Sequence, residues 1–600
     1  MTATKYFLIF ILTITHYSCA NNQDINIVNE GKKLNQFFEN EFEKSVARYP
    51  TWQTYLGRKT NYGKLDNQTL EYAKEDYRSS KQSLIKLKSF NYESLSDADK
   101  ISYQIYEYQL KGSIEGYNWR FHHFPLNQMF GYQAETPAFL INMHQVGNEE
   151  DAKAYISRLK EIKRVFSENM IFLKKQESLG IFPPKFVFSK VINDSKNVIS
   201  GKPFSTSNED STLLEDFKRK LKKIKASPDK KVALMKQAEE ALKFYVKPAY
   251  DNLISYIEYL DKKVTTNNGA WSLPNGNAFY NYRLSRITTT DLKADEIHKT
   301  GLKEVHRIHA EMRKVMSKVN FKGGLKKFFQ YMKGNKFLYP QTKSGRRAYL
   351  NEVDKVVSNM KMALPQVFNT FPKAELKVKP VEAFREKSAG IAFYNGPSLE
   401  GNRPGIYYVN LYKMADNPKY KLEALAYHEA IPGHHMQIAI AKELEGIPTF
   451  RKTTGFTAYS EGWGLYAELL PKEMGFYSDP YSDFGRLSME LWRATRMVVD
   501  TGIHSKKWSR EQAIKYLSDN TPNSKLEIMK GIERYFIMPA QATAYKVGML
   551  KILFLRSKAK NRLKSKFDLA EFHDVVLKNG AVPLFILEDN INSWIQKKSI

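Results

Sequence analysis

The segment AYHEAIPGHHMQ, from Ala426 to Gln437, contains residue types that bind and use a zinc ion. Zinc peptidases of the His-Glu-x-x-His type place two histidines four residues apart on one face of a helix, with a catalytic glutamate beside the first. Here Pro432 occupies the position of the second histidine, and the nearest histidines are His434 and His435. In a regular helix neither can share an ion with His428, because six residues turn the side chain onto another face and seven move it about 10.5 Å along the axis.

Pro432 and Gly433 indicate that the helix is not regular between the histidines. Proline lacks a backbone donor and clashes with the preceding turn, and glycine relaxes the backbone where a bulge must form. We predict a distorted helix in which two residues loop out, so that His434 takes the place of the second ligand beside His428. His435 then points away around the helix, toward the substrate or toward an acceptor that orients a ligand.

A third ligand is expected from the downstream segment YSEGWGLYAE. Glu461 and Glu468 are seven residues apart in it and share one face of a helix. Two imidazoles and one carboxylate leave a fourth position of zinc open for water, and a neighbouring carboxylate can deprotonate that water. The sequence therefore predicts a Zn²⁺ site with His428, His434 and Glu461 as metal ligands. Glu429 is the expected general base, and Glu468 is expected to orient one of the metal ligands without binding the metal itself.

Asp500 and His504 have the spacing of a pair on one helix face. A carboxylate can orient an imidazole, and an oriented imidazole can stabilise a developing oxyanion. We therefore consider His504 a candidate catalytic residue that Asp500 orients. Burial in the core of a helical domain is the alternative.

Most of the chain has the apolar periodicity of helices, and strand patterns are few. The clearest helical patterns cover Asp151–Lys174, Leu234–Lys262, Asp291–Val319 and Tyr481–Asp500. The best strand pattern is GIYYVNLY, Gly405–Tyr412, whose backbone we expect to be available to an extended peptide. The sequence thus predicts a mainly α fold with a small β-sheet beside the zinc helix. Within residues 33–600, the loop-like stretch 265–277 is a candidate boundary.

The N-terminal stretch MTATKYFLIFILTITHYSCA has the features of an export signal, because Lys5 precedes an apolar run that is too short to span a bilayer. Cys19 is the only cysteine of the chain and lies where a lipoprotein signal places its lipidated residue. We predict a signal peptide over residues 1–19, lipidation of Cys19 and a polar tether over residues 20–32. The protein is then a cell-envelope lipoprotein, periplasmic or surface-facing, that meets the membrane through its lipid only. Secretion as a free protein is the alternative.

The charge balance is strongly basic, with 93 Lys and Arg against 64 Asp and Glu, a formal net charge of +29. The lysines are scattered among the helical patterns, apart from one dense patch at Lys218–Lys231. No zinc-knuckle spacing, phosphate-binding loop or RNA-binding aromatic signature accompanies them. We interpret the charge as a solvated basic surface and expect no nucleic-acid partner.

These motifs resemble the bacterial domain-of-unknown-function family 885, whose members are mostly exported. Its marks are His-Glu-x-x-Pro-Gly-His-x-x-Gln, here HEAIPGHHMQ, and Glu-Gly-Trp-x-x-Tyr-x-Glu, here EGWGLYAE. The similarity continues through RMVVDTGIH, PAQATAYKVG and FDLAEFHDVVLKNGAVPL, and it covers nearly the whole mature chain. One departure is Ala540, which stands where the family has glycine before Gln541.

The resemblance implies a large helical, zincin-like fold similar to carboxypeptidase Taq, thimet oligopeptidase and angiotensin-converting enzyme. It also implies that Tyr545 donates its phenol to the oxyanion, with a place in the core as the alternative. We therefore expect a zinc metallopeptidase that cleaves short peptides with a metal-activated water. A zinc hydrolase of non-peptide amides and a catalytically inactive binding lipoprotein are the alternatives. The choice between exo- and endopeptidase, the preferred residue and the oligomeric state stay open at this point.

Overall fold

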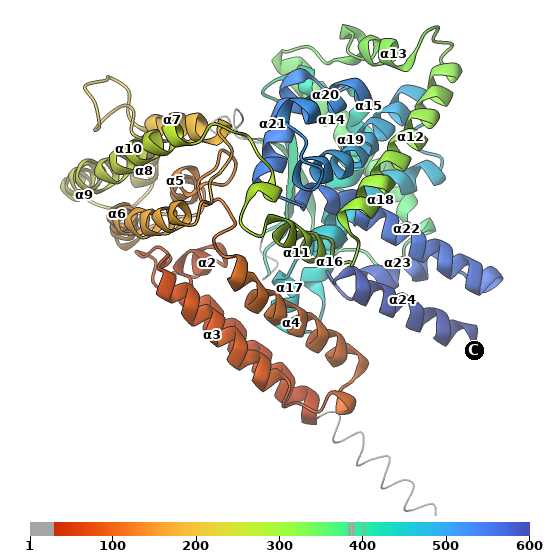
Figure 1. The fold of residues 1–600 in the computed structure, drawn as a ribbon, viewed down its shortest axis with the longest axis horizontal. Helices are drawn as coiled ribbons and strands as arrows, with labels where there is room; N and C mark the ends of the chain where they lie inside the picture. The colour runs from red at the N-terminus through yellow and green to blue at the C-terminus, as the bar shows by residue number, and fades with distance from the viewer. Residues whose placement is uncertain (1–28, 382–385, 387–389, 400–402) are drawn as a thin grey trace, which may run out of the picture. The chain divides into compact units, whose positions relative to one another are not determined.

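The computed structural model describes residues 29–381, 386, 390–399 and 403–600, and these residues form a mainly α-helical protein with one small β-sheet (Figure 1). The predicted fold class, mainly α with a small sheet, is confirmed. Cys19 and the predicted signal peptide lie outside the described residues. None of the helices described is long and apolar enough to cross a membrane. The chain divides into two compact units between Asn267 and Asn268, within the loop-like stretch 265–277.

In its described part, residues 29–267, the first unit consists of helices joined by turns and loops, with one isolated bridge. Its helices are residues 29–48, α2 (Pro50–Tyr55), α3 (Leu70–Leu87), α4 (Asp97–Gly116), α5 (Tyr132–Asn142), α6 (Glu149–Ser178), α7 (Phe186–Val198), α8 (Thr212–Leu221), α9 (Pro228–Ala241) and α10 (Lys247–Lys263). Residues 29–32, the end of the predicted tether, begin the first of these helices, in which Leu34 and Phe38 are fully buried. A π-helical turn, Leu242–Val246, joins α9 to α10, so the pattern predicted at 234–262 is one interrupted helix.

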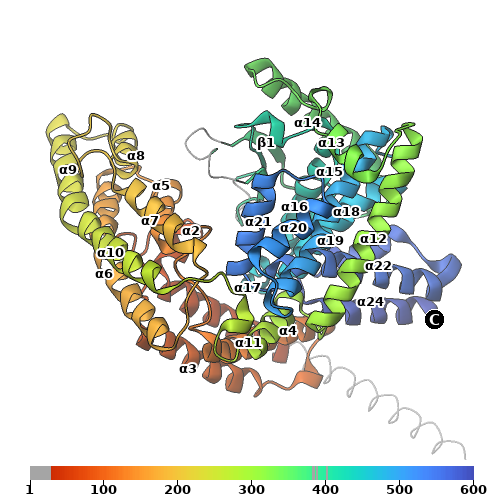
Figure 2. The same ribbon diagram turned by 45° about the horizontal axis from the view of Figure 1, so that its top comes forward.

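The second unit carries every residue of the predicted site. Its helices are α11 (Gly276–Thr288), α12 (Ala294–Lys318), α13 (Leu325–Tyr331), α14 (Lys343–Ala363), α15 (Lys419–Glu429), α16 (His434–Glu443), α17 (Thr449–Thr453), α18 (Thr457–Glu473), α19 (Pro480–His504), α20 (Arg510–Asn520), α21 (Lys525–Ile537), α22 (Ala544–Leu563), α23 (Leu569–Leu577) and α24 (Leu584–Ser599). Figure 2 shows α12 running alongside α19 in this unit. α19 also packs against α15, and α18 packs against α22.

The core between these helices follows from their apolar faces. Ile308 and Met312 are one turn apart on α12, and Phe484, Leu487 and Leu491 repeat at helical spacing on α19. All five side chains are buried in one cluster. At roughly 1.5–3 kcal/mol for each large apolar side chain removed from water, this burial outweighs any single polar contact of the site. The two helices that carry the predicted motifs, α15 and α18, are therefore held by rigid neighbours.

The sheet has the strand order β1-β3-β2, with β1 (Leu376–Pro380) parallel and β2 (Ala392–Asn395) antiparallel to β3 (Gly405–Val409). Every residue of β3 is buried, and the side chains of Tyr407 and Val409 join a core cluster that contains Leu422 and Ala426 of α15. The sheet thus lies beside the helix that carries His428. One prediction is wrong: β3 cannot offer its backbone to a peptide, because β1 and β2 occupy both of its edges.

Candidate metal centre and the cavity beside it

The first motif forms two helices and not one bulged helix. α15 ends at Glu429 and α16 begins at His434, and the residues between them form a turn in which the Ile431–Pro432 peptide is cis. The predicted bulge is therefore wrong in form. A bulge keeps the helix axis continuous, whereas this turn restarts the helix, so that His434 becomes the first residue of a new one.

Close packing explains why this turn contains glycine and why it is held in place. A Cβ atom on Gly433 would lie 1.9 Å from the carbonyl oxygen of His428, so no other residue fits there. Trp463, which is fully buried on α18, donates its indole N–H to the carbonyl oxygen of Pro432 at 2.8 Å. The second motif thereby fixes the turn that separates the two histidines of the first.

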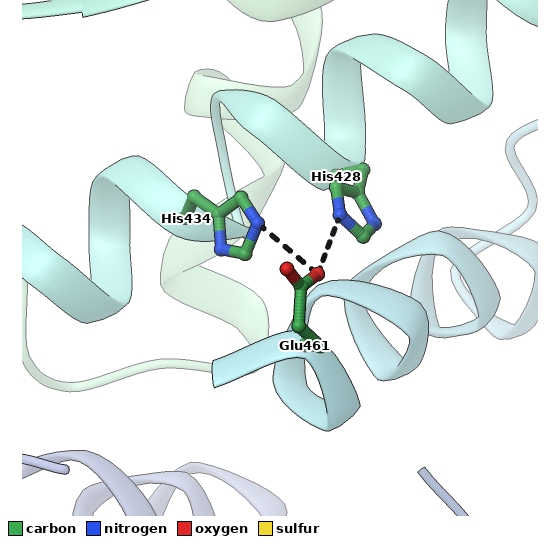
Figure 3. A group of neighbouring side chains, drawn as sticks. All are labelled: His428, His434 and Glu461. Atoms are coloured by element: carbon green, nitrogen blue, oxygen red, sulfur yellow. Dashed lines mark ion pairs between the residues drawn. The ribbon is translucent and has the colours of Figure 1, made fainter. Parts of the chain in front are cut away.

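Figure 3 shows the imidazoles of His428 and His434 directed at the carboxylate of Glu461. The Nε2 atoms of His428 and His434 lie 3.5 and 3.6 Å from Oε2 of Glu461. One ligand atom from each residue can be chosen so that all three lie within 4.8 Å of one another. Two ligands of a tetrahedral zinc ion, each at about 2.1 Å, are roughly 3.4 Å apart. The nitrogen–oxygen separations of 3.5 and 3.6 Å are close to this value, so the three residues could hold one ion.

His428 is further constrained by Glu468. Its Nδ1 donates to Oε1 of Glu468 at 2.8 Å, which leaves Nε2 to face Glu461. Burial alone would lower the pKa of His428, but the carboxylates of Glu461 and Glu468 raise this pKa to about 9. Burial would raise the pKa of Glu461, but its ion pairs with His428 and His434 hold that pKa well below the usual range. Without a metal, His428 is therefore an imidazolium beside ionised carboxylates, and a bound metal ion would take the place of its Nε2 proton. The candidate donor set is two imidazoles and one ionised carboxylate, and Glu468 gives His428 the support that metal-binding histidines usually have.

The glycines of EGWGLYAE make room for this arrangement. A Cβ atom on Gly464 would lie 2.6 Å from Cε1 of His428, so the imidazole packs directly on the backbone of α18. A Cβ atom on Gly462 would lie 2.6 Å from Cα of Gly548, which lets α18 and α22 approach closely. The four residues from Glu461 to Gly464 therefore provide, in order, a candidate ligand, a close helix contact, support for the turn and space for an imidazole ring.

Glu429, the predicted general base, lines a cavity of about 530 Å³. It directly follows His428 at the end of α15, and only 7 % of its surface is exposed. Its Oε2 is buried and has no hydrogen-bond partner among the described residues. Glu429 thus lines the cavity with a carboxylate oxygen that has no hydrogen-bond partner among the described residues. It directly follows the candidate ligand His428 in the sequence.

His435 lies away from Glu461. The structure pairs its Nδ1 with the hydroxyl of Tyr394 at 2.9 Å, and its backbone N–H donates to the carbonyl of Ala430. Burial lowers the pKa of His435 to about 4, although a hydrogen bond to the backbone carbonyl of Ala374 opposes the shift. His435 therefore connects the start of α16 to strand β2, and the three residues that converge include His434 and not His435.

His504 is the residue whose expected role the packing contradicts. The backbone N–H of Ala270 donates to its Nδ1 at 2.9 Å, and its Nε2 donates to the carbonyl of Tyr535 at 2.9 Å. Burial lowers the pKa of His504 to about 4. With both ring nitrogens engaged by backbone groups and no exposed surface, His504 cannot reach an oxyanion. It is a core residue, the alternative that the sequence left open.

Asp500 likewise does not orient His504. Its Oδ1 accepts hydrogen bonds from the hydroxyl of Tyr280 at 2.6 Å and from the backbone N–H of Ala540 at 3.0 Å. Burial raises the pKa of Asp500 to about 7 against the effect of these hydrogen bonds. Ala540 adopts φ 73°, a left-handed conformation that favours glycine, which explains the family's glycine at this position.

Tyr545 lies on α22 one turn before Gly548 and therefore near the α18 contact that flanks Glu461. Its ring packs with Leu465 and Met549, and the guanidinium of Arg496 lies 4.6 Å from the ring centre. The predicted contact between its phenol and an oxyanion stays a prediction.

Three arginines of the cavity wall were missed by the sequence reasoning: Arg493 and Arg496 of α19 and Arg534 of α21. A signal for the first two existed, because the spacing in LWRATRMVV places two guanidiniums on one face of an otherwise apolar helix. Arg534 had no such signal, since it meets them only through the packing of α21.

Comparison with known proteins agrees with this fold. The family described as "Bacterial protein of unknown function (DUF885)" matches residues 50–591. A crystal structure of "the putative lipoprotein from Colwellia psychrerythraea" is similar, with 30% identity, 95% of this chain and 99% of that chain covered, and a TM-score of 0.88. "A putative lipoprotein of unknown function from Shewanella oneidensis" shares the fold at 19% identity, with coverage of 93% and 99% and a TM-score of 0.73. None of the curated proteins matches the chain.

Proposed function

The chain belongs to the bacterial family of unknown function DUF885, and from the geometry of its site we propose that it is a zinc-dependent hydrolase of peptide bonds in short peptides. The observation that carries the proposal is the convergence of His428, His434 and Glu461 within 4.8 Å. Three protein ligands of this type are typical of catalytic zinc, because structural zinc sites are closed by four. The nitrogen–oxygen separations of 3.5 and 3.6 Å support the same ion.

A bound zinc ion would supply Lewis-acid chemistry, polarising a carbonyl and making water more acidic. The proton transfers and the orientation of the ligands fall to side chains of this chain. Glu429 has a carboxylate oxygen free to accept the proton of an attacking water and to return it to the leaving amine. Glu468 holds the Nδ1 proton of His428, which keeps the ring oriented toward Glu461.

The size of the cavity favours small substrates. Its volume of about 530 Å³ lies within the ~300–1,000 Å³ of pockets that enclose a single small ligand. Short peptides fit this range, and a folded protein does not. Non-peptide amides also fit, which keeps a zinc amidohydrolase as the second candidate.

The location proposed for this activity is the cell envelope. The two similar structures belong to proteins described as putative lipoproteins, which supports lipidation of Cys19 here. A peptidase anchored in this way would act outside the cytoplasm on peptides that reach the envelope.

A peptide-library digest tests the proposal. The full-length protein is loaded with zinc, its metal content is measured, and new peptide termini are identified by mass spectrometry, with chelator-treated protein as the control. We expect stoichiometric zinc and zinc-dependent cleavage. Zinc-loaded protein that releases amines only from non-peptide amides would support the second candidate. A protein that binds no zinc, or binds zinc and cleaves neither class, would instead be a binding lipoprotein.

A further inference from the structure

The cavity beside Glu429 has a basic wall that the hydrolytic chemistry does not use. Arg493 and Arg496 project from the same face of α19, and Arg534 comes from α21. Lysines 413, 421 and 530 also line the cavity, so that six cationic side chains face four acidic ones. One of those four is Glu429 itself.

The protein does not saturate these three guanidiniums. Each makes one hydrogen bond: Arg493 Nη1 donates to the carbonyl of Met489 at 3.2 Å. Arg496 Nε donates to the hydroxyl of Tyr535 and Arg534 Nη2 donates to Oε1 of Gln541, both at 3.0 Å. Nη1 of Arg496, Nε of Arg534 and Nε of Arg493 are buried and have no acceptor among the described residues. Buried donors of a charged group that lack an acceptor are costly, and a bound anion would supply the missing acceptor.

Nearby carboxylates are already engaged elsewhere. Glu468 lies 3.7 Å from Nη2 of Arg493, but it accepts the shorter bond from His428 at 2.8 Å. Asp416 pairs at 3.7 Å with Lys413, a cation of the same cavity lining, and Glu527 accepts the backbone N–H of Ser524 at 2.8 Å. Arg493, Arg496 and Arg534, which we call the arginine wall, therefore keep an excess of positive charge. The contact of Arg493 with Glu468, which in turn binds His428, places this charge close to the candidate metal centre.

We propose that this arginine wall binds a carboxylate of the substrate, which makes peptides with a carboxylate close to the scissile bond the preferred class. Guanidinium groups pair with carboxylates through two parallel hydrogen bonds, which gives geometry as well as affinity. The carboxylate is either the C-terminal carboxylate or an acidic side chain beside the cleaved bond. The inference deepens the proposed function and rests on it for the cleavage, but not for the binding.

Binding to metal-free, full-length protein tests the wall without interference from a metal that could itself attract carboxylates. The probes are three tripeptides labelled with fluorescein at the N-terminus: one with a free C-terminus, its C-terminal amide, and an amide whose last residue is glutamate. We expect the free acid to bind at least tenfold more tightly than the plain amide by fluorescence anisotropy. Tight binding of the glutamate amide would identify the side chain as a second source of the carboxylate.

Variants locate the effect. Arg534→Gln should reduce the preference for the acid several-fold, Arg534→Lys should restore part of it, and Lys530→Gln, at an exposed residue of the same wall, should weaken it mildly. Arg313→Gln removes an exposed cation of α12 away from the cavity wall and should leave the preference unchanged. Equal affinities for acid and amide in the unaltered protein would overturn the inference. A preference that survives in a protein that cleaves no peptide would leave this inference standing and reject the proposed hydrolysis alone.

Discussion

The indole N–H of Trp463 donates to the carbonyl oxygen of Pro432 across 2.8 Å, and together with the bond from His428 to Glu468 it joins the two motifs of the site. Pro432 lies in the turn that separates His428 from His434, and Trp463 lies two residues after Glu461. The hydrogen bond therefore helps to set the distance between the histidine pair and the carboxylate of the candidate metal centre.

Replacing Trp463 with phenylalanine should weaken zinc binding by roughly tenfold, the lower end of what loss of a supporting contact costs a metal site. The reason is that the turn loses its fixed hydrogen bond while the ligands stay in place. Competition with a chelating dye measures the zinc affinity. Trp594→Phe is the matched control, because Trp594 donates its indole N–H to Glu571 on α23, outside the site. Equal zinc affinities of the two variants would show that the hydrogen bond from Trp463 does not support zinc binding.

The two adjacent histidines should separate in a metal assay. His434→Ala removes an imidazole whose Nε2 lies 3.6 Å from Glu461, so this variant should lose stoichiometric zinc. His435→Ala removes a contact to Tyr394 instead, so it should retain zinc and show reduced thermal stability. Atomic absorption after dialysis gives the zinc content. The reverse pattern would assign the ligand to His435.

Glu429→Gln should retain zinc and lose turnover by roughly 10²–10⁴-fold, the share that general acid–base catalysis usually supplies. Glutamine keeps the size of the side chain but cannot accept a proton. Glu461→Ala serves as the contrast, because it removes a ligand and should lose the metal. Peptide hydrolysis and zinc content are measured on both proteins. Near-normal hydrolysis by Glu429→Gln would exclude this residue as the base.

His504 should make stability depend on pH. Its pKa falls from 6.5 to about 4 on burial, so between these values the unfolded chain binds a proton that the folded protein does not. Stability is therefore highest above pH 6.5 and falls as the pH drops toward 4, by roughly 3 kcal/mol for this group. His504→Gln offers an acceptor and a donor without titrating, so its melting temperature should fall less between pH 7 and pH 5. His306→Gln, at an exposed histidine of α12, should follow the unaltered protein. An unchanged slope in His504→Gln would show that this histidine is not the buried base described here.

Cys19→Ser should release the protein from the membrane fraction and abolish its labelling by palmitate. A lipid chain is the only membrane attachment that the sequence suggests, and replacing the sulfur by oxygen removes the site of acylation. Fractionation of cells grown with labelled palmitate measures both effects. Unaltered protein that is soluble and unlabelled would indicate ordinary secretion.

Local sequence patterns were enough to predict the helices and the types of residue in the candidate metal site. The apolar periodicity of 481–500 corresponds to α19, and the strand pattern from Gly405 corresponds to β3, because both patterns reflect repeats within a few residues. The candidate ligands could be predicted for the same reason. His428 and His434 lie within one short motif, and Glu461 and Glu468 lie within another. The family resemblance added which motifs belong together.

Other features of the site depend on tertiary structure and could not be predicted from the spacing of residues in the sequence. The turn at Pro432 breaks the helix because Gly433 packs against the carbonyl of His428 and Trp463 holds the turn from another helix. His504 is engaged by Ala270 and Tyr535, residues that are remote from it in sequence, so no local pattern could have told a core histidine from a catalytic one. The arginine wall needs α19 and α21 to converge. This convergence depends on how whole helices pack together, and the residue pattern within a single helix does not predict that packing.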